Sequence, residues 1–231
     1  NQIFEAAGFI FAGMAPFLPH DLLDNRFVLT AGRSIFWENE QALILSDLHI
    51  GKSGHFRKSG IAIPQSILLE DMQRLLDQVQ NFKPSRIIVV GDLFHSHANR
   101  ELDLFMRWRD QFSQVPFQLV MGNHDILQAD WYQQAGIDLF REPLLIKQFA
   151  FIHDISDLKE DDEQYYFSGH IHPGYHLNGA GRQHLQLPCY YFGKKHAVLP
   201  AFGKFTGTHS IRPKKGEAIY VLVNNQVMRM Q

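Results

Sequence analysis

The chain has 231 residues, of which 45% are hydrophobic and 20% are charged, and its formal net charge at pH 7 is −2. This length suits one large domain with a well-filled core and is short for two, so we expect residues 1–231 to form a single domain. The small net charge excludes a strong overall attraction to nucleic acid or to a membrane surface. The one cysteine, Cys189, cannot form an internal disulfide, and we therefore expect a reducing, cytoplasmic setting.

The first twenty residues, NQIFEAAGFIFAGMAPFLPH, are apolar but lack a basic start and contain Glu5, Pro16 and Pro19. An export signal or a membrane anchor is therefore not expected, and no stretch reaches the roughly 18 apolar residues of a spanning helix. We interpret this segment as a pair of core strands.

Three short apolar runs then have the form of buried strands: ALILSD (42–47), SRIIVVGD (85–92) and FQLVMGN (117–123). Two segments have apolar residues at helical spacing and are predicted to be helices. They are 64–82, between the first two runs, and 101–112, before the third. This alternation favours parallel strands with right-handed crossovers. The carboxyl ends of such strands open on one edge of the sheet, where ligands bind.

The second half of the chain changes character. Two further strand-like runs, QFAFIHD (148–154) and YYFSGHIH (165–172), precede a segment rich in glycine and aromatic residues, and Asn224-Asn225 near the end suits a hairpin turn. We expect a second, mixed sheet. The predicted fold is α/β, a four-layer αββα sandwich of two mixed β-sheets flanked by helices.

Polar residues follow each of the central apolar runs. Carboxylate, amide and imidazole groups are ligands of Mn²⁺, Fe²⁺, Zn²⁺ or Ni²⁺, and the lack of thiolates argues against a structural zinc. The candidate ligands are more than one ion needs. They suit two ions bridged by a carboxylate, and such a pair of ions would bind the attacking and leaving oxygens of phosphoryl transfer. The candidate ligands are Asp47, His49, Asp92, Asn123, His153, His170 and His172, with His124 beside them.

Each of these residues has a simpler interpretation when taken alone. A histidine after a strand is usually a solvated loop residue or a core residue, and an aspartate there is often a helix cap. We accept the simpler interpretation for the histidines outside the motifs, namely His20, His176, His184, His196 and His209. The spacings DxH, GD, GNHD and GHxH, in this order and each at a strand end, are hard to obtain by accident.

This ordered set resembles the calcineurin-like metallophosphoesterase superfamily, over residues 47 to 172. The resemblance implies two divalent metal ions per chain, with Mn²⁺ favoured over Fe, Zn or Ni. One ion would be held by Asp47, His49 and His172, and the other by Asn123, His153 and His170, with Asp92 bridging. His124 would face the scissile phosphate as a general acid or as a stabiliser of its developing charge.

Longer motifs narrow the resemblance. Protein phosphatases of the superfamily have GDxxDRG, whereas LFHSHA follows Asp92 here, so the aspartate that would orient the catalytic histidine is missing. DLHIGKSGHFRKSGIAIP (47–64), LPCYYFG (187–193) and LPAFGKFTG (199–207) resemble the bacterial ligase-associated DNA-damage-response phosphoesterases. That family implies phosphodiesterase or nuclease activity on DNA, with a DNA ligase and a helicase as partners in repair.

The charge distribution independently favours a polyanionic substrate. No acidic residue lies between Glu163 and Glu217, so we expect a locally basic surface there. Its cations are Arg182, Lys194, Lys195, Lys204, Arg212, Lys214 and Lys215. Lys52 and Arg57 follow the first two candidate ligands directly and are predicted to bind substrate phosphates.

The aromatic residues in and near these basic segments either stack on nucleic-acid bases or belong to the hydrophobic core. Aromatic residues at this density are more often core residues. They are Phe56, Tyr190, Tyr191, Phe192, Phe202 and Phe205.

Two other functions stay open. The same metals would serve a phosphoesterase acting on a small or lipid-linked phosphodiester or pyrophosphate. A non-catalytic scaffold subunit of a repair complex is disfavoured, because a scaffold has no need of a complete ligand set and of His124.

Overall fold

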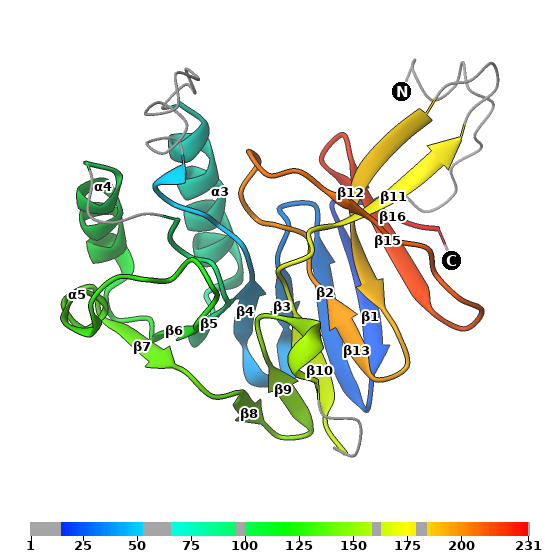
Figure 1. Cartoon of the computed structure of the whole chain (residues 1–231), viewed down its shortest axis with the longest axis horizontal. Coiled ribbons are helices and arrows are strands. Elements are labelled where there is room, and N and C mark those ends of the chain that lie inside the picture. Colours follow the sequence, from blue (N-terminus) through cyan, green and yellow to red (C-terminus); the bar gives the residue numbers. More distant parts are fainter. Residues whose placement is uncertain (1–14, 53–65, 96–99, 159–162, 179–183, 231) are drawn as a thin grey trace.

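A seven-stranded and a nine-stranded β-sheet pack face to face in this chain (Figure 1). The structure, a computed structural model, describes residues 15–52, 66–95, 100–158, 163–178 and 184–230. The predicted opening pair of strands therefore lies largely outside the described residues, although residues 17–20 of that segment do form part of a strand, β1.

The first sheet has the strand order β1-β2-β3-β4-β5-β6-β7. Its first four strands are antiparallel to one another, and β4, β5, β6 and β7 are parallel, as the strand–helix alternation predicts. The strands are β1 (Phe17–Leu22), β2 (Asn25–Thr30), β3 (Ile35–Trp37), β4 (Ala42–Leu45), β5 (Arg86–Val90), β6 (Phe117–Val120) and β7 (Ile137–Phe140).

The helices of the described residues cover the outer face of this first sheet (Figure 1). They are α3 (Ser66–Phe82), α4 (Arg100–Arg109) and α5 (Ala129–Gln134). Helix α3 buries Leu68, Met72 and Leu75 against Leu43 and Leu45 of β4, which is the helical face that the sequence pattern predicts. No helix of the described part of the chain is long and apolar enough to span a membrane.

The second sheet has the order β14-β11-β12-β13-β10-β9-β8, and β15 and β16 continue it from β12. The predicted turn at Asn224 and Asn225 is confirmed, since both have positive φ and join β15 to β16. The strands are β8 (Leu144–Ile146), β9 (Phe149–Phe151), β10 (Tyr165–Ser168), β11 (Pro173–Asn178), β12 (His184–Phe192), β13 (His196–Val198), β14 (His209–Ser210), β15 (Ala218–Val223) and β16 (Gln226–Arg229).

Aromatic rings fill the space between the two sheets. Phe27 and Trp37 of the first sheet stack at 5.4 Å between ring centroids, and Phe149 of the second sheet meets both edge-on. These rings are fully buried, and each buried ring contributes about 1.5–3 kcal/mol relative to an exposed one. This core fixes the two sheets relative to each other, so that β4, β5 and β6 present their carboxyl ends beside those of β9 and β10.

Candidate metal centre

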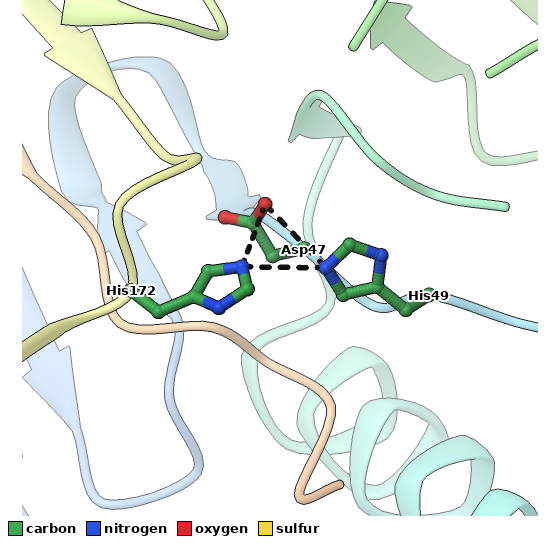
Figure 2. A group of neighbouring side chains, drawn as sticks. All are labelled: Asp47, His49 and His172. Atoms are coloured by element: carbon green, nitrogen blue, oxygen red, sulfur yellow. Dashed lines mark hydrogen bonds and ion pairs between the residues drawn. The ribbon is translucent and has the colours of Figure 1, made fainter. Parts of the chain in front are cut away.

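Three candidate ligands from both sheets converge at one point (Figure 2). Asp47 and His49 follow β4 of the first sheet, and His172 precedes β11 of the second. Asp47 Oδ1 lies 3.3 Å from His172 Nε2 and 3.9 Å from His49 Nε2, and the two imidazole Nε2 atoms are 3.3 Å apart. The first predicted ligand group is thus assembled in space.

The second group forms at the ends of β5, β6, β9 and β10. His153 Nε2 lies 3.4 Å from Asp92 Oδ1, 3.1 Å from Asn123 Oδ1 and 3.1 Å from His170 Nδ1. All four residues are candidates for the second ion, and together with the first group they bring the seven predicted ligands into one region.

Asp92 stands between the two groups. Its Oδ1 faces His153, while its Oδ2 lies 4.0 Å from His49 Nδ1 in the first group. Burial would raise the pKa of Asp92, but the hydrogen bond and charge of His153 outweigh burial and lower it to about 2. A buried carboxylate that faces both groups is suited to bridge two ions, as the resemblance implies.

Five of the seven candidate ligands have a left-handed backbone. The φ angles of Asp47, His49, Asp92, His170 and His172 lie between 48° and 66°. Residues other than glycine seldom adopt this conformation, which costs on the order of 1–3 kcal/mol each and is concentrated at functional sites. The strand ends are therefore shaped for the positions of these side chains at the expense of local stability.

Glycines leave the space that the ligands occupy. A Cβ on Gly122 would lie 2.1 Å from Asp92 Oδ1, and one on Gly169 would lie 2.4 Å from Asp47 Oδ2. Both distances are shorter than real Cβ contacts, so any side chain at these positions would displace a candidate ligand. The glycines of GNHD and SGHIH are thus part of the site.

The donor set fits divalent ions. Asp47 Oδ1 and His49 Nδ1 are buried and have no hydrogen-bond partner among the described residues. Ligand atoms at about 2.0–2.2 Å from a central ion are roughly 3–3.6 Å apart in tetrahedral or octahedral geometry, close to most of the separations found here. Burial lowers the pKa of His49 to about 3, so its imidazole is neutral, the form that binds a metal.

Neighbouring groups orient two of the imidazoles. His153 Nδ1 lies 3.3 Å from the carbonyl oxygen of Val90, which leaves Nε2 directed at Asp92. Asp154 Oδ2 lies 3.6 Å from His170 Nε2, which leaves Nδ1 directed at His153. Partners of this kind fix the ring and its tautomer in metal sites. The sequence motifs do not single out Asp154, which is the last residue of the run FIHD.

His124 is placed beside Asp92 and open to solvent. Its backbone N–H donates to Asp92 Oδ1 at 2.9 Å, and its Nε2 lies 4.0 Å from Asp92 Oδ2. The side chain is 40% exposed, against 3% for Asp92. This position lets the imidazole meet a substrate that approaches the metal groups from solvent.

The comparisons with known proteins agree with this geometry. The model of the calcineurin-like phosphoesterase family matches residues 41–172, which include every candidate ligand. The chain belongs to the calcineurin-like phosphoesterase family. It is a metal-dependent phosphoesterase, a hydrolase, with two candidate metal-binding groups.

Among solved structures, the nuclease MPE of Pseudomonas putida is 27% identical and has a TM-score of 0.78, covering 93% of this chain and all of that one. The phosphoesterase Yfce of E. coli is 14% identical with a TM-score of 0.42, covering 79% of this chain and 88% of that one. None of the curated proteins matches the chain.

Of the two residues predicted to bind substrate phosphates, the structure describes Lys52. Lys52 lines a pocket together with His49, which places it beside the first ligand group. Burial lowers the pKa of Lys52, against the attraction of Asp47 and Asp92. Arg57 lies outside the described residues.

The lysines of the acid-free segment do not share one edge of the molecule. Lys194 and Lys195 lie in the turn between β12 and β13. Since β13 runs parallel to β10, this turn is at the amino end of β10, whereas His170 follows the carboxyl end. Lys204 instead lines a depression next to Lys52. Only part of the expected basic surface therefore lies near the metal groups.

Supporting residues of the site were not foreseen in the sequence. Asp125 is 1% exposed and accepts N–H groups from Phe94 at 3.0 Å and Gly122 at 2.9 Å, which ties the loop of Asn123 to the loop of Asp92. Asp125 is the last residue of GNHD, and its role in joining the two loops follows from the structure alone.

His95 has its ring centroid 4.2 Å from that of His124. It occupies the position after GDxx that holds the orienting aspartate of GDxxDRG. A second imidazole therefore contacts His124 where that aspartate is missing.

We predict that Asp92→Asn abolishes phosphoesterase activity and lowers metal occupancy below two ions per chain, because this carboxylate faces both groups. Elemental analysis of the purified variant measures the occupancy. Asp138→Asn, at an exposed position on β7, is the matched control and should keep both metals. Two bound ions per Asp92→Asn chain would exclude the bridging role.

Proposed function

We propose that this phosphoesterase is a dinuclear metal-dependent phosphodiesterase that cuts DNA, as a nuclease of a ligase-associated repair system. The observation that carries the proposal is the convergence of Asp47, Asp92 and the histidine pairs of both sheets at one solvent-accessible edge. The structural neighbour named a nuclease, which spans 93% of this chain, supports the choice of a nucleic-acid substrate.

The residues of the chain divide the work as follows. Asp47, His49 and His172 would hold one ion, Asn123, His153 and His170 the other, and Asp92 both. When bound, the two ions would supply charge stabilisation for the attacking and leaving oxygens of the phosphodiester.

His124 lies on the solvent side of Asp92 and would donate a proton to the leaving oxygen or stabilise charge on the phosphate. Lys52, beside His49, would bind a phosphate oxygen of the substrate. We propose manganese as the native metal, DNA as the substrate, and a DNA ligase and a helicase of the same repair system as partners.

The direct test is hydrolysis by the purified protein of single-stranded DNA, double-stranded DNA and bis(p-nitrophenyl) phosphate, with Mn²⁺, Fe²⁺, Zn²⁺ or Ni²⁺ in turn. We expect cleavage of DNA, with the greatest rate in Mn²⁺. Rapid hydrolysis of the small diester without any DNA cleavage would favour the small-diester phosphoesterase instead. Absence of hydrolysis with every metal would favour the scaffold.

We predict that His124→Ala keeps both metals but reduces the turnover number on the order of 10²–10⁴-fold, the usual range for one acid–base group. His176→Ala replaces an exposed histidine of β11 that lies outside both ligand groups and should retain wild-type turnover. Metal loss from the His124 variant would make this residue a ligand rather than a proton donor.

A further prediction concerns the salt dependence of DNA binding, measured in the His124→Ala background so that the DNA stays intact. Replacement of Lys52 and Lys204 by alanine should reduce the slope of log affinity against log salt by roughly 0.7 per lost phosphate contact on single strands. Replacement of Lys194 and Lys195 removes the same charge at the other end of the sheet and should leave the slope near its original value.

Equal slopes for both double variants would show that the lysines near the metals do not follow a nucleic-acid backbone. A small diester offers one charge, so that result would favour it as the substrate.

A further inference from the structure

A depression opens beside the first ligand group. A narrow pocket of about 30 Å³ is lined by His49, Lys52, Phe205 and Thr206, among others. It adjoins a wider space of about 350 Å³ that shares Lys52, Phe205 and Thr206 and adds Lys204 and Gly207. Since small-ligand sites have volumes of about 300–1,000 Å³, this space is large enough for one nucleotide unit. We call it the 204–207 groove.

The loop that forms this groove is fixed to the metal centre through its backbone. The N–H of Phe202 donates to the carbonyl oxygen of Ser46 at 2.8 Å, and the N–H of Gly203 donates to that of Asp47 at 3.0 Å. A Cβ on Gly203 would lie 2.7 Å from the carbonyl oxygen of Leu48, so only glycine allows this approach. The groove therefore keeps its position relative to Asp47.

Charged side chains hold the same loop from below. Asp71 Oδ2 accepts the N–H of Lys204 at 3.0 Å and its Oδ1 pairs with Arg74 at 2.8 Å, while the Arg74 guanidinium lies 4.4 Å from the ring centroid of Phe202. Arg33 Nη1 donates to the carbonyl oxygens of Ala201 and Gly203, each at 3.2 Å. The loop is thus preorganised, so a ligand that binds in the groove loses little free energy in ordering it.

Phe205 is exposed on this fixed loop. Of the six aromatic residues singled out in the sequence, Tyr190, Tyr191, Phe192 and Phe202 are buried, Phe56 lies outside the described residues, and Phe205 is 42% exposed. An aromatic face within reach of a cationic side chain is a surface on which a nucleotide base can stack while its phosphate meets the cation. Lys52, Lys204 and Thr206 line the groove with it. The Lys204 ammonium pairs at the surface with Glu70 Oε2 at 3.0 Å, an exposed ion pair that a phosphate can replace.

We infer that the 204–207 groove is a nucleotide subsite, in which Phe205 stacks on the base next to the scissile phosphate. Lys52 and Lys204 would contact the adjoining phosphates. An aromatic face with flanking lysines is the combination that binds single-stranded nucleic acid without regard to sequence. This inference rests on the proposed function and names the part of the site that would distinguish a nucleotide from a simple diester.

Chromogenic diesters test the subsite separately from DNA cleavage. The p-nitrophenyl esters of thymidine 5′- and 3′-monophosphate are compared with the corresponding abasic deoxyribose esters, which lack only the base. For wild-type protein we expect KM to be on the order of 10-fold lower with the base than without it for one of the two isomers, the scale of one stacked base. Phe205→Ala should remove this difference, whereas Phe205→Tyr, which keeps an aromatic face, should retain it.

Two controls separate a loss of base stacking from a general loss of activity. The base preference is the ratio of the two KM values within one variant, so a change in activity that affects both esters equally does not alter it. Phe17→Ala removes the other exposed phenylalanine of the described residues, whose ring contacts Phe82 at the end of α3 remote from the pocket, and should leave the base preference unchanged.

Cleavage of single-stranded DNA by the wild type is measured in parallel. If the wild type cuts DNA but Phe205→Ala keeps the full preference for the base, the subsite is excluded and the proposed function stands. If the wild type hydrolyses the esters without any preference for the base and leaves DNA intact, the nuclease function itself fails and the subsite with it.

Discussion

The metal centre depends on the left-handed backbone at the ends of the central strands. The loops that follow β4, β5 and β10 contain five residues with positive φ, namely Asp47, His49, Asp92, His170 and His172. The left-handed residues turn the chain in the loops that leave these strands, and their side chains meet at the strand ends. The conformation costs on the order of 1–3 kcal/mol per residue, and it persists because the packed sheets on either side determine where the chain turns.

Burial of the carboxylates is a second unfavourable contribution to the free energy of folding. Asp47 is fully buried and Asp92 is 2% exposed, and an ionised carboxylate in such a place requires hydrogen-bond donors or cations. Backbone N–H groups supply part of the requirement: His170 donates to Asp47 Oδ2 at 3.0 Å and His124 to Asp92 Oδ1 at 2.9 Å. Both donors are themselves residues of the site, so the carboxylates hold the loops of His170 and His124 in place. Divalent ions would offset the remaining cost, and metal binding should therefore stabilise the fold as well as enable hydrolysis.

The candidate ligands singled out in the sequence lie together in the structure, because the apolar runs that precede them form neighbouring strands. That local pattern also predicted β4, β5 and β6, the helices between them, and the hairpin at Asn224. The local pattern could not predict which residues far apart in the sequence pack together. Short strands such as β7 and the short helix α5 have few residues from which to read a period. Lys194 and Lys204 look alike in the sequence, yet the antiparallel return of β12 and β13 places one at the far end of the sheet and the other beside Lys52. Exposure of Phe205 among buried aromatic neighbours likewise follows from the anchored loop and not from composition.

The most direct test of the dinuclear centre is anomalous diffraction from crystals grown with Mn²⁺. A centre bridged by Asp92 should give two anomalous peaks, roughly 3.5–4 Å apart, as in two-metal phosphoesterases. One peak should lie among Asp47, His49 and His172, the other among Asn123, His153 and His170, with Asp92 in contact with both. A single peak in fully active, metal-saturated protein, or two peaks away from Asp92, would contradict a bridged dinuclear centre.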